Sequence, residues 1–377
     1  MTGKTTPPFR GDHVGSLLRP ARLLADRFDF SAGRIDADDL RECEDAAIRD
    51  AVAMQEGIGL KSATDGEFRR EQWHSDFIYS LGGIRKGPLL PMEIQAYTKD
   101  KTIGWRPNAT EITGKVHLAG GGERGGQAIF GDHFTFLKET VTTATPKITI
   151  PSPSMVHFRV DLTGSPYESI EEFRADVAQA YIDEMLALYD LGARYLQLDD
   201  TIFAFLGDPA WRQAQAASGL DPEHQHEINV GVINTVLAAK PADMAVTIHM
   251  CRGNYQSAWF SSGGYDFVAE AVFGGLRADG LFLEYDDERS GGFEPLRYVR
   301  DDTSVVLGLV TTKTPALESP DALKRRVDEA AKYVDIDRLC LSGQCGFAST
   351  VEGNALTIDQ EKAKLELIVR VAEEIWG

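Results

Sequence analysis

The sequence has no long hydrophobic run and few cysteines. A membrane-spanning helix needs roughly 20 consecutive apolar residues, and no stretch of this chain approaches that length. Residues 1–10 also lack the apolar core of a secretory signal. Only four cysteines occur in 377 residues, which argues against a disulfide framework and favours free or metal-bound thiols. We therefore expect a cytoplasmic protein with no membrane partner.

Basic residues are also in short supply. The chain has 39 Lys and Arg against 58 Asp and Glu, so its formal net charge is −19. Sequence-independent binding to nucleic acid or to an anionic membrane depends on clustered basic residues, and we expect neither partner. The content of 43% hydrophobic and 26% charged residues is ordinary for a globular protein. We expect this protein to form a homo-oligomer.

Short apolar runs alternate with longer amphipathic segments along the chain. The predicted strands are 10–14, 61–65, 147–150, 195–198, 245–250, 280–285, 304–310 and 338–342. The predicted helices are 36–56, 70–80, 169–191, 222–239, 265–273, 320–334 and 359–375. This alternation is typical of parallel strands joined by crossover helices, and eight strands indicate an α/β protein with a closed (β/α)8 TIM barrel. An open doubly wound sheet is the alternative fold.

The segment 82–145 fits neither element. It is rich in Gly, Pro and Thr and contains a run of three glycines at 120–122. We interpret it as an excursion after the second strand, a hairpin packed over the mouth of the barrel. No internal repeat, low-complexity tract or linker divides the chain, so residues 1–377 are predicted to form a single domain.

A barrel predicts where catalytic groups lie, because they occupy the C-terminal ends of its strands. Polar residues follow each predicted strand. They are His13 and Ser16, Asp65 and Glu67, Ser152 and Ser154, Asp199 and Asp200, His249 and Cys251, Glu284, Asp286 and Asp287, Thr311 and Thr312, and Cys345.

The most informative pair is His249 and Cys251. They end the run 245–250 at spacing i, i+2, so both side chains project from the same side of a strand. His-x-Cys alone is a weak signal, because a free Cys is commonly a small buried apolar residue. Glu284 and Cys345 at later strand ends complete a set that fits tetrahedral Zn²⁺. A carboxylate ligand is the more readily displaced, which favours a catalytic site whose open position takes a small thiol.

Several further residues have both a functional and a structural interpretation. Glu67 and Asp199 are expected in the site rather than in a helix cap, whereas His13 fits a site and a satisfied core histidine equally well. Arg19 and Arg252 would suit the anionic tail of a substrate, and a plain salt bridge explains each of them equally well. Cys340 is expected to pack in the core.

Taken together, the strand-end motifs resemble the C-terminal catalytic barrel of cobalamin-independent methionine synthase. The matching stretches are Asp-His-Val-Gly-Ser-Leu-Leu-Arg-Pro at 12–20, Thr-Asp-Gly-Glu at 64–67, Leu-Gln-Leu-Asp-Asp at 196–200, His-Met-Cys-Arg-Gly-Asn at 249–254, Leu-Glu-Tyr-Asp at 283–286 and Cys-Gly at 345–346. The resemblance runs nearly end to end. It implies a zinc-dependent barrel with His249, Cys251, Glu284 and Cys345 as ligands. It also implies that Ser16, Glu67 and Asp199 hold the amino-acid part of homocysteine.

The chain departs from the full-length family in two ways. It lacks the additional N-terminal barrel, and residues 148–154 read Ile-Thr-Ile-Pro-Ser-Pro-Ser where the family carries a Thr-Gly-Pro-type stretch of the folate site. Short single-barrel relatives include the epoxyalkane:coenzyme M transferases, and the length looks most like these. The reaction expected from this resemblance is the opening of an aliphatic epoxide by coenzyme M. Methyl transfer to homocysteine is the alternative, and Glu67 and Asp199 favour it.

Both reactions use a zinc-held thiolate, and only the electrophile differs. For the epoxide, His13, Asp199 or an ordered water would supply the proton, and Arg19 or Arg252 would hold the sulfonate. For the methyl donor, Glu67 and Asp199 would hold the ammonium of the amino acid. A glycosidase using Glu284 with Asp199 would leave the histidine and the thiols without a role. A protein that binds a thiol without catalysis is the least favoured reading.

Overall fold

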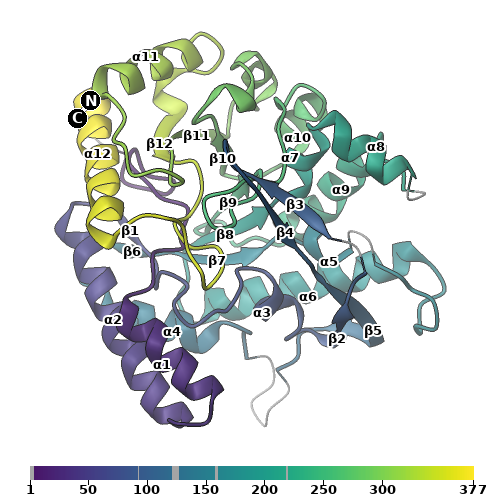
Figure 1. Cartoon of the computed structure of the whole chain (residues 1–377). Coiled ribbons are helices and arrows are strands. Elements are labelled where there is room, and N and C mark those ends of the chain that lie inside the picture. The colour runs from purple at the N-terminus through teal and green to yellow at the C-terminus, as the bar shows by residue number, and fades with distance from the viewer. Residues whose placement is uncertain (1–3, 92, 121–126, 158–159, 218–219) are drawn as a thin grey trace.

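The computed structural model describes residues 4–91, 93–120, 127–157, 160–217 and 220–377, and Figure 1 shows their arrangement. Its centre is a parallel six-stranded sheet in the order β12-β11-β10-β9-β8-β7. The strands are β7 (Ile148–Pro151), β8 (Tyr195–Asp200), β9 (Ala245–Met250), β10 (Gly280–Glu284), β11 (Ser304–Val310) and β12 (Leu339–Gly343). Every residue of β8, β10 and β12 is buried. Burial on both faces is expected for parallel strands that helices cover from outside.

The remaining part of the barrel is closed by short pairings. β1 (Ser62–Ala63) pairs in parallel with β6 (Thr145–Pro146), which leads directly into β7. The predicted strand 10–14 forms one parallel bridge, between Gly11 and Leu341 of β12. Together these pairings complete the α/β TIM barrel, so the predicted fold class is confirmed.

Between segments 10–14 and 61–65, side-chain hydrogen bonds take the place of backbone hydrogen bonds between paired strands. Asp12 Oδ1 accepts hydrogen bonds from the His13 backbone N–H and from Ser62 Oγ, both at 2.8 Å. Thr64 Oγ1 donates to the Gly15 carbonyl at 2.6 Å. Segment 10–14 therefore meets segment 61–65 through side-chain bonds, and this explains why its strand is short.

Amphipathic helices cover the outside of the sheet, as Figure 1 shows. They include α1 (Ala21–Ser31), α2 (Ala37–Gly57), α4 (Gly131–Thr140), α6 (Ile170–Asp190), α9 (Gln225–Ala238), α10 (Ala269–Gly275), α11 (Pro320–Ala330) and α12 (Ile358–Trp376). Capping boxes at Asp36 and Thr357 begin α2 and α12 by satisfying backbone N–H groups of the first turn. In the described part of the chain, no helix combines the length and apolar character needed to cross a membrane.

The helix predicted for 70–80 is reduced to one turn, α3 (Ser75–Ile78). The preceding residues pair with a distant loop instead. Gln72 forms an antiparallel bridge with Thr350, and the Trp73 N–H donates to the Ser349 carbonyl at 3.0 Å. This tertiary pairing outweighs the local helical pattern over 71–73.

The segment 82–145 divides into two parts. Its first part is a pair of antiparallel ribbons, β2 (Gly82–Leu89) with β5 (Asn108–His117) and β3 (Ile94–Tyr97) with β4 (Thr102–Trp105). Figure 1 shows the β3–β4 ribbon passing in front of the central sheet, and Tyr97 pairs with Trp259 of the loop that follows β9. The second part contains α4 and β6, which are elements of the barrel. Residues 92 and 121–126 of the segment lie outside the described residues.

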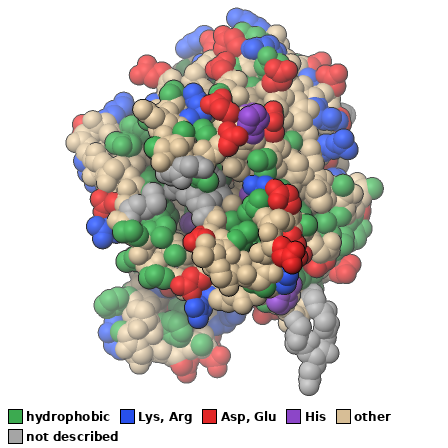
Figure 2. Space-filling model, turned by 90° about the vertical axis from the view of Figure 1, so that its right-hand side faces the viewer, with side chains coloured by type: hydrophobic (Ala, Val, Ile, Leu, Met, Phe, Trp, Pro, Cys, Tyr) green, Lys and Arg blue, Asp and Glu red, His purple; other side chains and the backbone are tan. Residues whose placement is uncertain are grey.

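Charge on the outer surface is mixed. On the face drawn in Figure 2, acidic and basic side chains are interspersed with scattered hydrophobic ones. The most exposed large apolar side chains, Phe28, Leu89 and Leu317, come from separate parts of the chain. This face therefore shows no continuous basic patch of the kind that binds nucleic acid.

Candidate active site and metal centre

Four predicted ligand residues meet at the C-terminal ends of three strands. His249 lies on β9 with Cys251 directly after it, Glu284 ends β10, and Cys345 follows β12. Their ligand atoms all lie within 4.8 Å of one another, and the Cys251 and Cys345 sulfurs are 3.3 Å apart. All four residues are buried. We call these four residues the ligand cluster.

The cluster has the donor set and the unmet bonding capacity of a metal site. Both ring nitrogens of His249 and Oε1 of Glu284 are buried without a hydrogen-bond partner among the described residues. Leaving buried polar atoms unpaired costs about 1–3 kcal/mol each, so a native site needs a reason for them. One imidazole, two thiols and one carboxylate fit a tetrahedral Zn²⁺ ion. A metal at this position would use one ring nitrogen of His249 and a carboxylate oxygen of Glu284.

The cluster favours the thiolate form of Cys345. The Cys251 thiol and His249 both lower the pKa of Cys345, because each interacts favourably with the Cys345 thiolate. The same contact with Cys345 raises the pKa of the Cys251 thiol, whose sulfur accepts a hydrogen bond from the Gly253 N–H at 3.2 Å. Because metal ligands bind deprotonated, the contacts of Cys345 lower the cost of loading that ligand.

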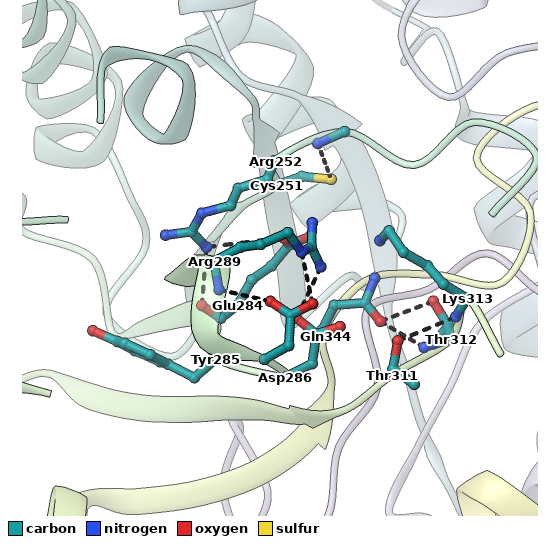
Figure 3. A network of polar contacts seen from close by, with 12 residues as sticks. Cys251, Arg252, Glu284, Tyr285, Asp286, Arg289, Thr311, Thr312, Lys313 and Gln344 are labelled. Carbon is teal, nitrogen blue, oxygen red and sulfur yellow. Dashed lines mark hydrogen bonds and ion pairs between the residues drawn. The ribbon is translucent and has the colours of Figure 1, made fainter. Parts of the chain in front are cut away.

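Glu284 is held from behind by Arg252, as Figure 3 shows. Arg252 Nη1 donates to the Glu284 carbonyl at 2.9 Å and lies 3.9 Å from Glu284 Oε2. Other contacts of the same guanidinium go to the Gly263 carbonyl and the Tyr265 hydroxyl. Burial raises the pKa of Glu284 to about 7, while Lys313 and Arg252 act in the opposite direction. Arg252 thus supports a ligand residue, and its predicted contact with a substrate anion stays a prediction.

Two further buried carboxylates come from other strand ends, Asp199 from β8 and Glu67 from the turn after β1. Gln197 Nε2 donates to Asp199 Oδ1 at 2.7 Å, and Thr149 Oγ1 donates to Glu67 Oε1 at 2.8 Å. Burial raises the pKa of Asp199 to about 7, His249 lowers it, and Glu67 raises it by repulsion. The pKa of Glu67 is raised as well, mainly by burial. We call these two side chains the acidic flank. Arg70 lies 3.6 Å from Glu67 Oε1 and pairs with it, whereas Asp199 forms no ion pair among the described residues.

The backbone explains how Glu67 reaches this position. Gly66 and Glu67 both have positive φ angles, of 67° and 61°. A left-handed residue other than glycine is uncommon and costs free energy, so the turn after β1 is strained where it carries Glu67. The Glu67 N–H is held by Asp65 Oδ1 at 2.9 Å, which helps to fix the turn.

Ser16 and His13 lie beside Cys345, and all three line one small space. The Ser16 hydroxyl accepts a hydrogen bond from the Ala348 N–H at 3.3 Å, and a Cβ at Gly346 would come within 2.0 Å of it. Only glycine therefore allows the two strand-end loops to meet there. Both ring nitrogens of His13 are buried without a partner among the described residues. Burial lowers the pKa of His13 to about 4, and Lys147 lowers it further, so the ring is neutral at pH 7.

Arg19 connects two loops through hydrogen bonds. Its two Nη groups donate to the carbonyls of Glu67, Arg70, Ala348 and Thr350 at 2.7–3.3 Å. The guanidinium therefore fastens the loop after β1 to the loop after β12. Its predicted role in binding a substrate anion stays a prediction, and these contacts give it a structural role.

Two groups near the ligand cluster were not predicted from the sequence. Lys313 is buried and its ammonium nitrogen has no partner among the described residues. Gln344 Oε1 accepts from the N–H and the hydroxyl of Thr312, at 2.6 and 3.1 Å, which leaves its buried Nε2 unpaired. The sequence did contain a signal for Lys313, because this residue directly follows the strand-end residues Thr311 and Thr312.

Comparison with known proteins places this site in a family. Residues 134–374 match the family described as the cobalamin-independent synthase catalytic domain. The uncharacterized protein YxjH of Bacillus subtilis is 46% identical over 370 residues, which is 98% of this chain and 95% of YxjH. A methionine synthase of Sulfurisphaera tokodaii is 22% identical, over 89% of this chain and 84% of that protein.

A solved structure from Listeria monocytogenes, described as a candidate vitamin-B12-independent methionine synthase, superposes with a TM-score of 0.76. It is 38% identical, and the match covers 99% of both chains. The relatives from Sulfurisphaera tokodaii and Listeria monocytogenes are described as methionine synthases, whereas the sequence analysis favoured an epoxyalkane:coenzyme M transferase. The comparisons give no support to that narrower resemblance. The ligand cluster, the barrel and the sequence match agree that this chain belongs to the cobalamin-independent synthase catalytic-domain family.

Proposed function

We propose that this protein transfers an alkyl group to the sulfur of a small thiol, and that it methylates homocysteine. The observation that carries the proposal is the buried ligand cluster with the acidic flank of Glu67 and Asp199 beside it. A zinc ion in the cluster would hold a thiol as a nucleophilic thiolate at neutral pH. The side chains around the cluster would bind and orient the rest of that thiol.

The acidic flank fits the ammonium group of an amino acid. Glu67 and Asp199 repel each other in a buried space, and this repulsion contributes to the raised pKa of Asp199. An ammonium group between them would remove the repulsion and donate charge-assisted hydrogen bonds to both carboxylates. Ser16 lies next to Cys345, where it can contact the same end of the amino acid.

Opening of an epoxide by coenzyme M is the second candidate. Its sulfonate would need a cation near the thiol, and the two arginines expected for this role have other contacts. Arg19 binds four carbonyls, and Arg252 stacks on Tyr265 at 4.2 Å and supports Glu284. The acidic flank would repel a sulfonate. The contacts of the two arginines and the charge of the acidic flank therefore favour an amino-acid thiol over coenzyme M.

We propose that part of the excursion covers the mouth of the barrel while the alkyl donor is bound. Trp105 of β4 makes an edge contact with Phe260 at 6.1 Å between ring centroids, and Tyr97 pairs with Trp259. These contacts connect the hairpin to the loop that leaves Cys251. A flat or apolar donor would find aromatic surface there.

The test is calorimetric titration of zinc-loaded protein with homocysteine and with coenzyme M, after zinc content has been measured. We expect about one zinc per chain, and tight binding of homocysteine with release of a proton. Glu67→Gln should weaken homocysteine about 10- to 100-fold, because it removes a charge-assisted hydrogen bond. Zinc content should not change.

Glu111→Gln on the exposed β5 strand is the matched control and should bind like the unaltered protein. Binding of coenzyme M without binding of homocysteine would replace the proposal by the epoxide reaction. A protein that holds no zinc would contradict both.

A further inference from the structure

Lys313 is the most conspicuous group that the proposed function leaves unused. It is 7% exposed, and its ammonium nitrogen forms neither a hydrogen bond nor an ion pair with a described residue. A buried charge without a partner is costly, so it is retained only where something compensates it. Its backbone is fixed by a hydrogen bond from the Lys313 N–H to Thr311 Oγ1 at 3.3 Å.

Neighbouring carboxylates are already paired with other cations. Glu318 lies 3.2 Å from the Lys364 ammonium and accepts from the Thr311 N–H. Asp286 is 3.7 Å from Arg289, and Glu284 has Arg252 behind it. None of these groups forms an ion pair with Lys313. The missing partner is therefore a bound molecule or the loaded metal centre.

Lys313 and the acidic flank come from different strand ends. Lys313 follows β11, which lies between β10 and β12 in the sheet, whereas Asp199 is on β8 and Glu67 follows β1. The ligand cluster comes from β9, β10 and β12, so Lys313 adjoins it on the β11 side and Asp199 on the β8 side. A thiol whose ammonium contacts the acidic flank would place its sulfur at the ligand cluster, which Lys313 adjoins.

The unpaired amide of Gln344 belongs to the same side as Lys313. Figure 3 shows both side chains in one network, coming from the ends of β11 and β12. Two buried hydrogen-bond donors without partners make a site for an atom with lone pairs or negative charge. We call Lys313 and Gln344 the donor flank.

We propose that Lys313, with Gln344 beside it, binds the leaving atom of the alkyl donor, and that this atom is a basic nitrogen or oxygen. The inference rests on the proposed function. As the thiolate sulfur forms the new C–S bond, the bond from that carbon to the leaving atom breaks, and the leaving atom keeps the electron pair. The Lys313 ammonium gives it a hydrogen bond and then the proton. Water returns a proton to Lys313 after the products leave.

A simpler role must be separated from this one. Zinc with two thiolates and one carboxylate would carry one net negative charge, and Lys313 could merely balance it. In that case its loss would change zinc or thiol binding and would slow reaction with every electrophile alike. A role at the leaving atom predicts dependence on the chemistry of the electrophile.

The experiment uses the full chain loaded with zinc and homocysteine and compares two probes. Propylene oxide leaves a basic oxygen on its product, whereas methyl iodide releases weakly basic iodide. Product formation on homocysteine is followed by mass spectrometry for the unaltered protein and for Lys313→Met, Lys313→Arg and Lys332→Met. Lys332 is an exposed residue after α11 and provides the matched control.

We expect Lys313→Met to slow reaction with propylene oxide about 100-fold, the size of a general-acid effect. The rate of reaction with methyl iodide should change less than about threefold, because iodide needs no proton donor. Zinc content and homocysteine affinity should also change less than about threefold, because they do not depend on a proton donor either. Lys313→Arg should recover part of the epoxide rate. Lys313→Met loses an unpaired buried charge, so the thermal midpoint of this variant should equal or exceed that of the unaltered protein.

Equal slowing with both probes, or loss of zinc or thiol binding, would overturn the inference and assign Lys313 to charge balance. An unchanged epoxide rate would also overturn it. If the unaltered protein binds zinc but no homocysteine, the proposed function fails, and the inference fails with it. That result is distinguished by the binding isotherm before any probe is added.

Discussion

The barrel is closed in two different ways on its two sides. From β7 to β12, neighbouring strands are joined by a continuous parallel ladder, which we call the ladder side. Between β12 and β7 the backbone contributes one bridge at Gly11 and the two-residue pair of β1 with β6. Buried side chains complete that part, which we call the seam side (Figure 1).

The two sides carry different parts of the site. The whole ligand cluster and Asp199 come from the ends of ladder strands, whereas His13, Ser16 and Glu67 come from the seam side. A metal needs its ligands fixed within a few tenths of an ångström, and a ladder supplies that rigidity. Groups that grip a substrate tolerate more adjustment. The difference suggests that metal binding and thiol binding can be disrupted separately.

The largest effect should come from the ladder side. Cys345→Ser removes a ligand 3.3 Å from Cys251 and should release most of the zinc. Methyl transfer should fall by more than the roughly 100-fold that loss of an outer-shell partner costs. Zinc analysis and the rate of homocysteine methylation measure both. Cys43→Ser, in α2 away from the cluster, should keep its zinc, and zinc retention by Cys345→Ser would remove Cys345 from the ligand set.

The next effect should come from the centre of the seam. Asp12 is fully buried, lies 3.4 Å from Lys147, and accepts a hydrogen bond from the Tyr195 hydroxyl at 2.8 Å. Asp12→Ala leaves Lys147 as an unpaired buried charge, which should lower the free energy of unfolding by about 3–5 kcal/mol. Urea unfolding measures this loss.

Adding Lys147→Met to that variant should recover part of the stability, because it removes the charge left unpaired. Zinc content of the folded protein should be unchanged in both variants. Loss of zinc at urea concentrations where the barrel remains folded would mean that the seam also positions the ligand cluster.

Much of the ladder side could be predicted from the sequence, and less of the seam side. The strands that carry the ligands are short runs of mostly apolar residues, and their ends placed His249, Cys251, Glu284 and Cys345 near one another. Segment 10–14 has only Val14 as a large apolar residue and forms one bridge, and Asp12 and Thr64 bond across the gap. Side-chain bonds between distant segments have no periodic signature.

The arginines and Lys313 illustrate a second limit. Arg19 and Arg252 occur at strand ends, so their placement near the site followed from the fold, but their partners are backbone carbonyls that the sequence does not identify. Lys313 is unusual because its ammonium has no partner among the described residues, and only a structure can show that. Predicted positions were therefore more reliable than predicted contacts.

The last effect should be a pH dependence on the seam side. Glu361 begins α12, is 1% exposed, and accepts a hydrogen bond from the Leu18 N–H at 2.7 Å. Burial raises its pKa from 4.5 to about 8, so the folded state keeps a proton that the unfolded state releases between these values. Its contribution to stability is full below pH 4.5, falls as pH rises, and is lost above pH 8.

Glu361→Gln keeps the acceptor for Leu18 and removes the titration. The variant should match the unaltered protein near pH 5 and exceed it by roughly 4 kcal/mol at pH 8 and above. Urea unfolding at both pH values measures the difference, and Glu366→Gln on the exposed face of α12 is the control. Equal gains at both pH values would show that the buried carboxyl does not titrate in this range. Leu18 directly precedes Arg19 on the seam side. A stability gain without a change in zinc content would show that the titration of Glu361 affects the seam side and not the ligand cluster.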